Sequence, residues 1–370
     1  MKDMAKTSSV KQSLASHLEY LNHGQFVYNS HLIQPNRTNI IALVQVHGRI
    51  EYLKLMISSL LEVTGIGERC VVVFSHDIYN ESVDQIILGI KTFPVMQIFY
   101  PYMDQLYPHG YPPDARSNCH LLSAEQMLKD PICSIGLTDD EKLRLKSHTR
   151  AAIKHHWWWK ANFAFEKLRI MDKGKMKVWF LEEDFYVYPD AIHVIDQLES
   201  KKECQGQIIS TGHTDDWLNI GAESYTKINF GGFSYPSFFG ALMDYKLFMQ
   251  FKEHFHFFCT YDDYNWDWTL IKMTGIKNMT LKQCKVEASR IQHIGRCGTH
   301  HKNGNCDANH LVDQTKLKIT NHRPHMFKQM KIVEYHNSPG AVNSNGFFGS
   351  ELDHFLCCLN TLTEDACECL

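Results

Sequence analysis

The early part of the chain alternates short apolar runs with longer amphipathic segments. The runs at 39–46, 70–74 and 95–100 have the length and composition of buried strands. Between them, over 49–63 and 81–93, apolar residues recur at helical spacing. Strands that alternate with helices, without hairpin signals, are typical of a parallel sheet in an α/β domain. We therefore predict an α/β fold in which a mostly parallel sheet is flanked by helices.

The remaining pattern adds loops, a long helix and a polar beginning. Residues 1–38 are polar and weakly periodic, so we interpret them as a stem or extension. Proline-rich loops are expected over 101–140 and a long helix over 142–171. Residues 212–237 are rich in Gly and Asn, which predicts a loop or lid.

Three carboxylates, Glu182, Glu183 and Asp184, directly follow an apolar strand predicted at 178–181. Clustered carboxylates repel and raise each other's pKa, and a divalent cation removes that repulsion. Mg²⁺ and Mn²⁺ bind through one or two carboxylates together with phosphate oxygens. A metal–diphosphate site at the strand end explains the cluster, and a solvated acidic loop explains it equally well.

The end of the first strand is also polar. No G-x-G-x-x-G motif follows it, which argues against a dinucleotide site. Instead the strand runs into Gln45-Val46-His47-Gly48-Arg49. These residues stand at the carboxyl edge of the predicted sheet, where α/β folds bind ligands.

Three consecutive tryptophans, Trp157 to Trp159, lie within the predicted long helix. Successive helical side chains point about 100° apart, so a helix packed on one side cannot bury all three. A helix in the middle of the domain is the simpler explanation, and a helix that lines a cleft is the alternative. Just before the tryptophans, Lys154, His155 and His156 are candidates to meet a phosphate.

A second acidic segment, residues 260–268, mixes carboxylates with aromatic rings. A carboxylate beside a flat ring can grip a sugar hydroxyl and act as a general base. Asp residues in the first turn of a helix, where they complement the dipole, are the plainer interpretation. Both can hold together, with Asp262 and Asp263 as helix caps and Asp267 in chemistry.

The segment from Cys297 to Cys306, which includes His300 and His301, allows two interpretations. Its spacing, C-x₂-H-H-x₄-C, is not a standard zinc-finger pattern. A Cys297–Cys306 disulfide is the favoured interpretation, and a zinc site is the alternative. His293, just before this segment, is either a metal ligand or an ordinary polar residue.

Composition narrows the class of protein. Among 370 residues, 44% are hydrophobic and 12% aromatic, enough for a substantial core. A net charge of −3 suggests neither nucleic acid nor an anionic membrane as a partner. Twelve cysteines and sequons at Asn36, Asn80 and Asn278 favour an oxidising lumen. No apolar run reaches 18 residues, so either the protein is cytosolic after all, or Met1 is not the native start and membrane attachment is only through an anchor outside this sequence.

Several of these segments together resemble the N-acetylglucosaminyltransferase II family, the α-1,6-mannosyl-glycoprotein 2-β-N-acetylglucosaminyltransferases. The resemblance covers residues 39–358, and its most specific runs surround Trp158 and Trp266. It implies a GT-A fold in one catalytic domain, with a nucleotide-binding part over 39–186 and an acceptor-binding part over 187–358. Residues 359–370 are left as a C-terminal tail. The segments that carry it are 45–53, 74–77, 154–160, 180–184, 259–270 and 300–302.

The resemblance also implies an activity and its residues. GlcNAc would pass from UDP-GlcNAc to O2 of the α1,6-arm mannose of an N-glycan, with inversion, in the Golgi lumen. Asp184 and His293 match Mn²⁺ ligands, Asp267 the catalytic base and Trp266 an acceptor contact. Whether the protein forms a homo-oligomer is left open. The positions that match the donor pocket are Gln45, Val46, His47, Gly48, Arg49, Asp77, Ala152, Ile153, Lys154, His155 and His156.

Cysteine positions extend the resemblance in part. Cys119 with Cys133, Cys259 with Cys357, and Cys297 with Cys306 match family disulfides. Two other family disulfides lack partners here: Cys204 stands alone in one, and His254 replaces a half-cystine of the other. Cys70 is expected to be a buried thiol. No pairing is assigned to Cys284, Cys358, Cys367 and Cys369.

Two departures bear on the substrate. Phe185 replaces a family His, and Phe238-Phe239-Gly240 replaces an Asn-x-Gly segment near the donor sugar. A β-1,2-GlcNAc transferase for another mannosyl acceptor therefore remains an alternative. A non-catalytic UDP-sugar- or glycan-binding relative is a further one.

Overall fold

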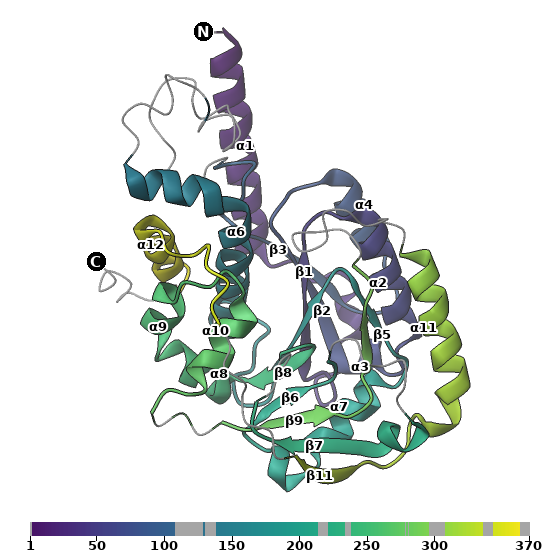
Figure 1. The fold of residues 1–370 in the computed structure, drawn as a ribbon. Helices are drawn as coiled ribbons and strands as arrows, with labels where there is room; N and C mark the ends of the chain where they lie inside the picture. Colours follow the sequence, from purple (N-terminus) through teal and green to yellow (C-terminus); the bar gives the residue numbers. More distant parts are fainter. Residues whose placement is uncertain are drawn as a thin grey trace.

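The computed structural model describes residues 2–107, 129, 138–213, 221–233, 238–277, 279, 281–295, 308–335 and 343–362. Across these residues, nine strands form one twisted sheet in the order β11-β7-β9-β6-β8-β4-β1-β2-β3 (Figure 1). The strands are β1 Ile40–Val46, β2 Cys70–His76, β3 Val95–Phe99, β4 Lys177–Glu182, β6 Ile208–Ser210, β7 Lys227–Gly231, β8 Ala241–Asp244, β9 Gln283–Val286 and β11 Lys331–Tyr335.

Parallel pairing dominates the half of the sheet that the sequence predicted. β1 pairs in parallel with β2 and with β4, and β2 pairs in parallel with β3. β8 is antiparallel to both of its neighbours, β4 and β6. The predicted mostly parallel α/β sheet flanked by helices is confirmed, and the fold is a single GT-A-like domain.

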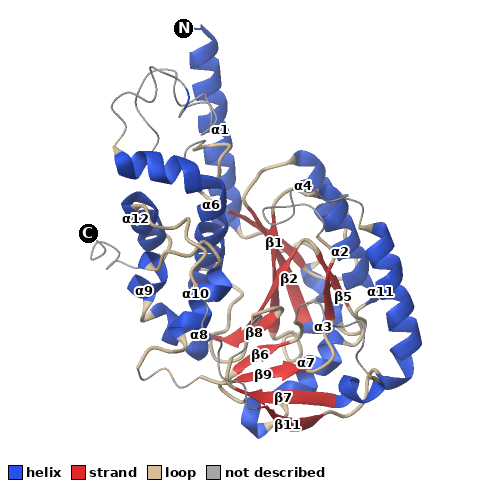
Figure 2. Ribbon diagram, viewed as in Figure 1, coloured by secondary structure: helices blue, strands red, loops and turns tan. Residues whose placement is uncertain are grey.

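Helices cover both faces of this sheet (Figure 2). Alternate residues of β1 serve the two sides: Ile41 and Leu43 join the core beneath α6, and Ala42 and Val44 join the core beneath α2. The helices are α1 Lys2–Gly24, α2 Ile50–Glu62, α3 Ile66–Arg69, α4 Glu81–Leu88, α6 Asp139–Glu166, α7 Ala191–Glu199, α8 Tyr245–Lys252, α9 Phe255–Thr260, α10 Trp266–Met273, α11 Asn309–His322 and α12 Glu351–Leu359.

Helix α6 is the long helix that the sequence predicted around the three tryptophans. Thr138 and Glu141 form a capping box at its start, which fixes the first residue at Asp139. The predicted helix, 142–171, is therefore shifted by a few residues at each end. Trp157, Trp158 and Trp159 are all buried, because sheet and helices surround α6 on several sides. The interpretation of a helix in the middle of the domain is confirmed, and the alternative also holds, because Trp157 of α6 lines a cavity.

Two parts of the chain differ from their expected structure. The predicted loop at 212–237 contains β7, whose short alternating segment Lys227-Ile228-Asn229 buries only Ile228 and so gave little apolar signal. The predicted stem contains α1, whose last turns pack beside β3. Asn22 there exchanges two hydrogen bonds with the Phe99 backbone, each of 2.7 Å. Among the described residues, no helix is both long and apolar enough to cross a membrane.

The disulfides correct one expectation and support another. Cys204 was expected to lack a partner, but it is bonded to Cys284 on β9. The two are 80 residues apart, and the pairing of β6 with β9 brings them together, so no local spacing could reveal the bond. The Cys259–Cys357 bond and the buried free thiol of Cys70 are as expected. The expected Cys119–Cys133 and Cys297–Cys306 pairs lie outside the described residues.

Candidate active site

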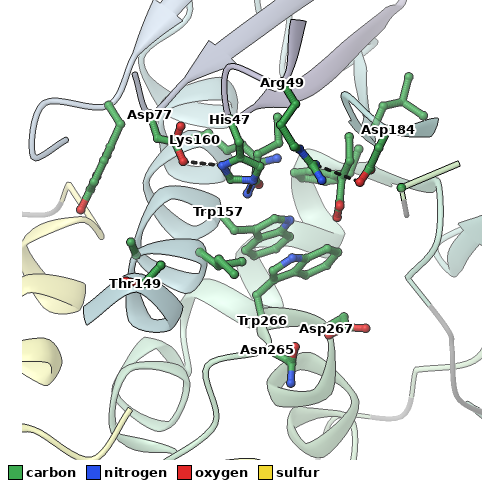
Figure 3. A pocket seen from close by; sticks show the side chains of 18 of the residues that line it. His47, Arg49, Asp77, Thr149, Trp157, Lys160, Asp184, Asn265, Trp266 and Asp267 are labelled. Atoms are coloured by element: carbon green, nitrogen blue, oxygen red, sulfur yellow. Dashed lines mark hydrogen bonds and ion pairs between the residues drawn. The ribbon is translucent and has the colours of Figure 1, made fainter. Parts of the chain in front are cut away.

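A cavity of about 780 Å³ opens at the carboxyl edge of β1, β2 and β4, between the sheet and helices α6 and α10 (Figure 3). Many of the residues singled out in the sequence line it. Those are Gln45, His47, Arg49, Asp77, Ala152, Ile153, Asp184, Trp266, Asp267 and His293. The strand order explains the convergence, because the parallel strands β1, β2 and β4 end side by side at this edge.

Some predicted donor-pocket residues lie elsewhere. Val46 is a buried strand residue, and Gly48 provides the turn with φ 76° that brings both His47 and Arg49 to the cavity. Lys154 donates to the Tyr261 carbonyl over 2.9 Å, and His155 lies 3.0 Å from Asp353. Neither Lys154 nor His155 is part of the cavity lining.

His156 is not part of the cavity lining and instead forms a cluster with His47 and Asp77. His47 Nδ1 is hydrogen-bonded to Asp77 Oδ2, and His156 Nδ1 lies 3.8 Å from the same oxygen. The other ring nitrogen of His156, Nε2, lies 2.8 Å from the Ser75 hydroxyl. Burial tends to lower the pKa of His47, but the contact with Asp77 outweighs it and raises that pKa to about 9. At neutral pH the pair is therefore ionic and can bind a polar ligand. His47, Asp77 and His156 also have the spacing to hold a cation, which would require His47 to lose its proton.

The acidic triplet separates into different roles. Glu183 is buried and accepts hydrogen bonds from the His47 amide, 3.0 Å, and from Arg49 Nε, 2.6 Å. Asp184 faces the cavity, where its Oδ2 lies 2.8 Å from Arg49 Nη2 and 3.3 Å from His293 Nε2. Burial tends to raise the pKa of Asp184, but His293 and Arg49 outweigh it and hold that pKa below its usual range. Asp184 is thus a carboxylate at neutral pH.

A small second sheet joins the two candidate metal ligands. β5, Phe185–Val187, is antiparallel to β10, Ile291–His293, and the Ile294 amide donates to the Asp184 carbonyl over 2.8 Å. Three features fit a divalent cation here: the carboxylate and imidazole donor set, a buried Asp184 Oδ1 without a hydrogen bond in the described structure, and the bare Gly295. A Cβ on Gly295 would come within 2.4 Å of Asp184 Oδ2 and fill the space beside it.

Asp267 lies across the cavity from Asp184, in the first turn of α10 (Figure 3). Its Oδ1 accepts from the Trp268 amide over 2.9 Å. Burial raises the pKa of Asp267 to about 7, the Trp268 amide opposes this shift, and the charge of Glu182 adds to it. A half-buried carboxyl with this pKa is suited to general-base chemistry near neutral pH.

Asp262 and Asp263 are not helix caps, and that interpretation is wrong. α10 begins three residues beyond Asp263, and its N-cap residue, Asn265, makes no capping bond through its side chain. Asp262 instead accepts from the Phe348 amide over 2.7 Å, and Asp263 accepts from the Asn345 amide over 3.1 Å. Both carboxylates hold the loop before α12 against the domain.

Sequence reasoning missed one lining residue and placed another only through the family resemblance. Lys160 is buried in the cavity wall, and its burial lowers its pKa to about 7 against the charge of Glu182. It stands one helical turn after His156, so the i, i+4 rule offered a signal. Phe239 also lines the cavity, and the resemblance had placed its segment near the donor sugar, although no local pattern points to it. Trp157, already noted for its burial, stacks on Trp266 with ring centroids 4.3 Å apart.

Sheet topology, the cavity at the carboxyl edge and the facing carboxylates together fit a glycosyltransferase of the GT-A class. Its relatives agree: the chain belongs to the N-acetylglucosaminyltransferase II family, whose sequence profile matches residues 15–357.

Curated relatives carry one enzyme name, alpha-1,6-mannosyl-glycoprotein 2-beta-N-acetylglucosaminyltransferase. The Rattus norvegicus protein is 32% identical over 339 residues, which cover 86% of this chain and 73% of the relative. The Homo sapiens protein is 32% identical over 337 residues, 86% and 72% of the two chains. The Arabidopsis thaliana protein is 27% identical over 335 residues, 87% and 74%.

Proposed function

We propose that this protein transfers GlcNAc from UDP-GlcNAc to O2 of the α1,6-arm mannose of an N-glycan, with Mn²⁺ and with inversion. One observation carries the proposal: Asp267, with its raised pKa, shares a cavity with the Asp184–His293 pair. The first is suited to activate a hydroxyl, and the second to hold the ion that a nucleotide diphosphate needs. The names of the relatives supply the donor sugar and the acceptor arm.

The nucleotide end of the donor is assigned to the β1–β2 side of the cavity. His47, Asp77 and Gln45 present both charges and an amide there, and Ala152 and Ile153 form an apolar wall. Arg49 is placed to meet the diphosphate, since its guanidinium already lies against Asp184.

Asp184 and His293 are the residues that would hold Mn²⁺. When bound, the ion supplies positive charge for the departing UDP. Arg49 Nη2 lies 2.8 Å from Asp184 Oδ2, so its guanidinium would stand beside the diphosphate when the site is loaded.

Asp267 performs the proton transfer. Its carboxylate takes the proton from the mannose O2 hydroxyl as that oxygen attacks C1 of the donor sugar on the face opposite UDP. The C1–O bond to UDP breaks as the new C1–O bond forms. One displacement inverts the anomeric centre, so no covalent sugar–enzyme intermediate is required. Trp266, stacked on Trp157, offers a flat apolar edge to the acceptor sugar.

We assign the protein to the Golgi lumen, and the Cys204–Cys284 and Cys259–Cys357 bonds support an oxidising compartment. The decisive experiment offers UDP-GlcNAc and Mn²⁺ with a glycan that has a free α1,6-arm mannose and GlcNAc on its α1,3 arm. Formation of the β-1,2-linked product is expected. No product from correctly folded protein would overturn the proposal.

A different mannosyl acceptor is the second candidate, because Phe185 and Phe238, the two departures from the resemblance, both line the cavity. A panel of mannosyl acceptors separates the two candidates: equal rates on both arms, or a preference for another acceptor, would favour the second. A non-catalytic relative would bind UDP-GlcNAc and turn over none of the panel.

A further inference from the structure

The imidazole of His293 is enclosed by two phenyl rings. Phe185 and Phe239 both meet it edge-on, at centroid distances of 6.1 Å and 6.2 Å and interplanar angles of 85° and 82°. The two phenyl rings pack on each other with centroids 4.4 Å apart. We propose that Phe185 and Phe239 are positioning residues, which fix the His293 ring in the orientation that a divalent cation requires. This inference rests on the cation site of the proposed function.

The orientation matters because of where the ring nitrogen lies. His293 Nε2 is 3.3 Å from Asp184 Oδ2. Two donor atoms bound at right angles to one ion at about 2.1 Å are themselves about 3.0 Å apart. The ring therefore needs only a small adjustment to share an ion with Asp184. A third of the His293 side chain is exposed, so without walls it could turn away from Asp184 into the cavity.

Phe185 is held by strand pairing. It lies directly opposite His293 in the antiparallel β5–β10 ladder. Opposed residues in such a ladder project to the same face, so the phenyl ring and the imidazole are held side by side. Phe185 is 3% exposed and immediately follows Asp184, which ties this wall to the other ligand.

Phe239 is held by a turn fastened to the end of β6. The Gly212 amide donates to the Phe239 carbonyl over 3.1 Å, and the Thr211 amide donates to the Gly240 carbonyl over 3.1 Å. Gly240 has φ 60°, and a Cβ there would come within 2.2 Å of Ile291 Cδ1 on β10. Only glycine permits this approach, so the turn carries Phe239 to the strand that bears His293.

Histidine ligands are usually oriented by outer hydrogen bonds, and loss of such support typically weakens metal binding 10- to 100-fold. Here aromatic packing adds its own constraint on the ring. If these phenylalanines are only core residues, their replacement should change stability and leave ion affinity alone. Ion affinity therefore separates the two roles.

The test measures Mn²⁺ affinity of the full chain by the electron paramagnetic resonance signal of free Mn²⁺, without donor or acceptor. Phe239→Leu and Phe185→Leu should each raise the dissociation constant about tenfold. Phe239→Tyr keeps the ring at a half-buried position and should keep wild-type affinity. Phe93→Leu is the matched control, because Phe93 is a buried phenylalanine packed near the amino end of β3, away from the cavity. Its affinity should be unchanged.

Each outcome has one meaning. Wild-type affinity in both leucine variants, together with a loss in His293→Ala, overturns the positioning role and leaves the cation site intact. Unchanged affinity in His293→Ala contradicts the cation site itself, and with it the proposed function. Equal weakening in Phe93→Leu would mean that any core damage lowers affinity, which also overturns the inference.

Discussion

Helix α6 carries histidines and basic residues on two sides, one of which faces the cavity and the other α12. Lys160 and Trp157 face the cavity, with His156 behind Asp77. On the other side, His155 and Arg144 both contact Asp353 of α12, at 3.0 Å and 3.2 Å. On the first side, polar groups point toward a cavity where a ligand can contact them. On the second side, the charged groups are paired with other residues of the protein. A histidine or lysine beside a binding residue therefore need not bind anything, since one step along a helix turns it by about 100°.

The most damaging change on the cavity side should be Asp267→Asn. The amide cannot accept the acceptor proton, so kcat should fall about 10²- to 10⁴-fold. UDP binding should persist, because Asp267 lies across the cavity from the assigned nucleotide residues. Steady-state kinetics with isothermal titration of UDP checks both. Retained turnover would remove Asp267 as the base.

On the opposite side of α6, Asp353→Ala should act on stability alone. It leaves Arg144 and His155 buried without their shared carboxylate, which typically costs about 3–5 kcal/mol. Urea unfolding measures the loss, and the KM for UDP-GlcNAc of the remaining folded protein should match wild type. A changed KM with unchanged stability would reverse the assignment of the two sides.

Lowering the pH should also distinguish the two sides, because it should reduce activity and stability over different pH ranges. Ionised Asp267 is the active form and its pKa is about 7, so kcat should drop about tenfold per pH unit below 7. Burial tends to raise the pKa of Asp353, but His155 and Arg144 hold it below its usual range. Its stabilising contribution is therefore present above its unfolded value, about 3.9, and is lost as pH falls further through the folded pKa. Activity should thus fail well before the fold, as pH profiles of kcat and of unfolding free energy would show.

The smallest effects are expected from a matched pair of buried lysines. Lys154→Met removes a hydrogen bond to the Tyr261 carbonyl and should cost about 1–3 kcal/mol without changing donor KM. Lys160→Met removes an amine from the cavity wall, whose pKa burial already lowers. It should raise donor KM severalfold and leave stability equal or higher. Similar behaviour of the two variants would contradict the division of α6.

Much of this architecture could be predicted from local pattern. Apolar runs in the sequence predicted the parallel strands. The carboxylates directly after β4 could be recognised because they follow one of these runs. Asp184, His293 and Asp267 could be proposed together only through the family resemblance, because their segments meet in space and not in sequence. The Cys204–Cys284 bond was missed for the same reason, because it depends on pairing between distant strands. Asp262 and Asp263 were misassigned because their partners, the Phe348 and Asn345 amides, lie 86 and 82 residues further along the chain.

The two-stranded sheet of β5 and β10 has a consequence for biosynthesis. Asp184 and His293 are 109 residues apart, so Asp184 leaves the ribosome long before its partner exists. Strands β1 to β4 are all made before β10, but their acidic edge stays incomplete until β10 has been made and has paired with β5. A nascent chain arrested before residue 293 should therefore carry a folded sheet edge that cannot yet hold an ion with both ligands. Loading of the proposed site would be among the last events in the maturation of this protein.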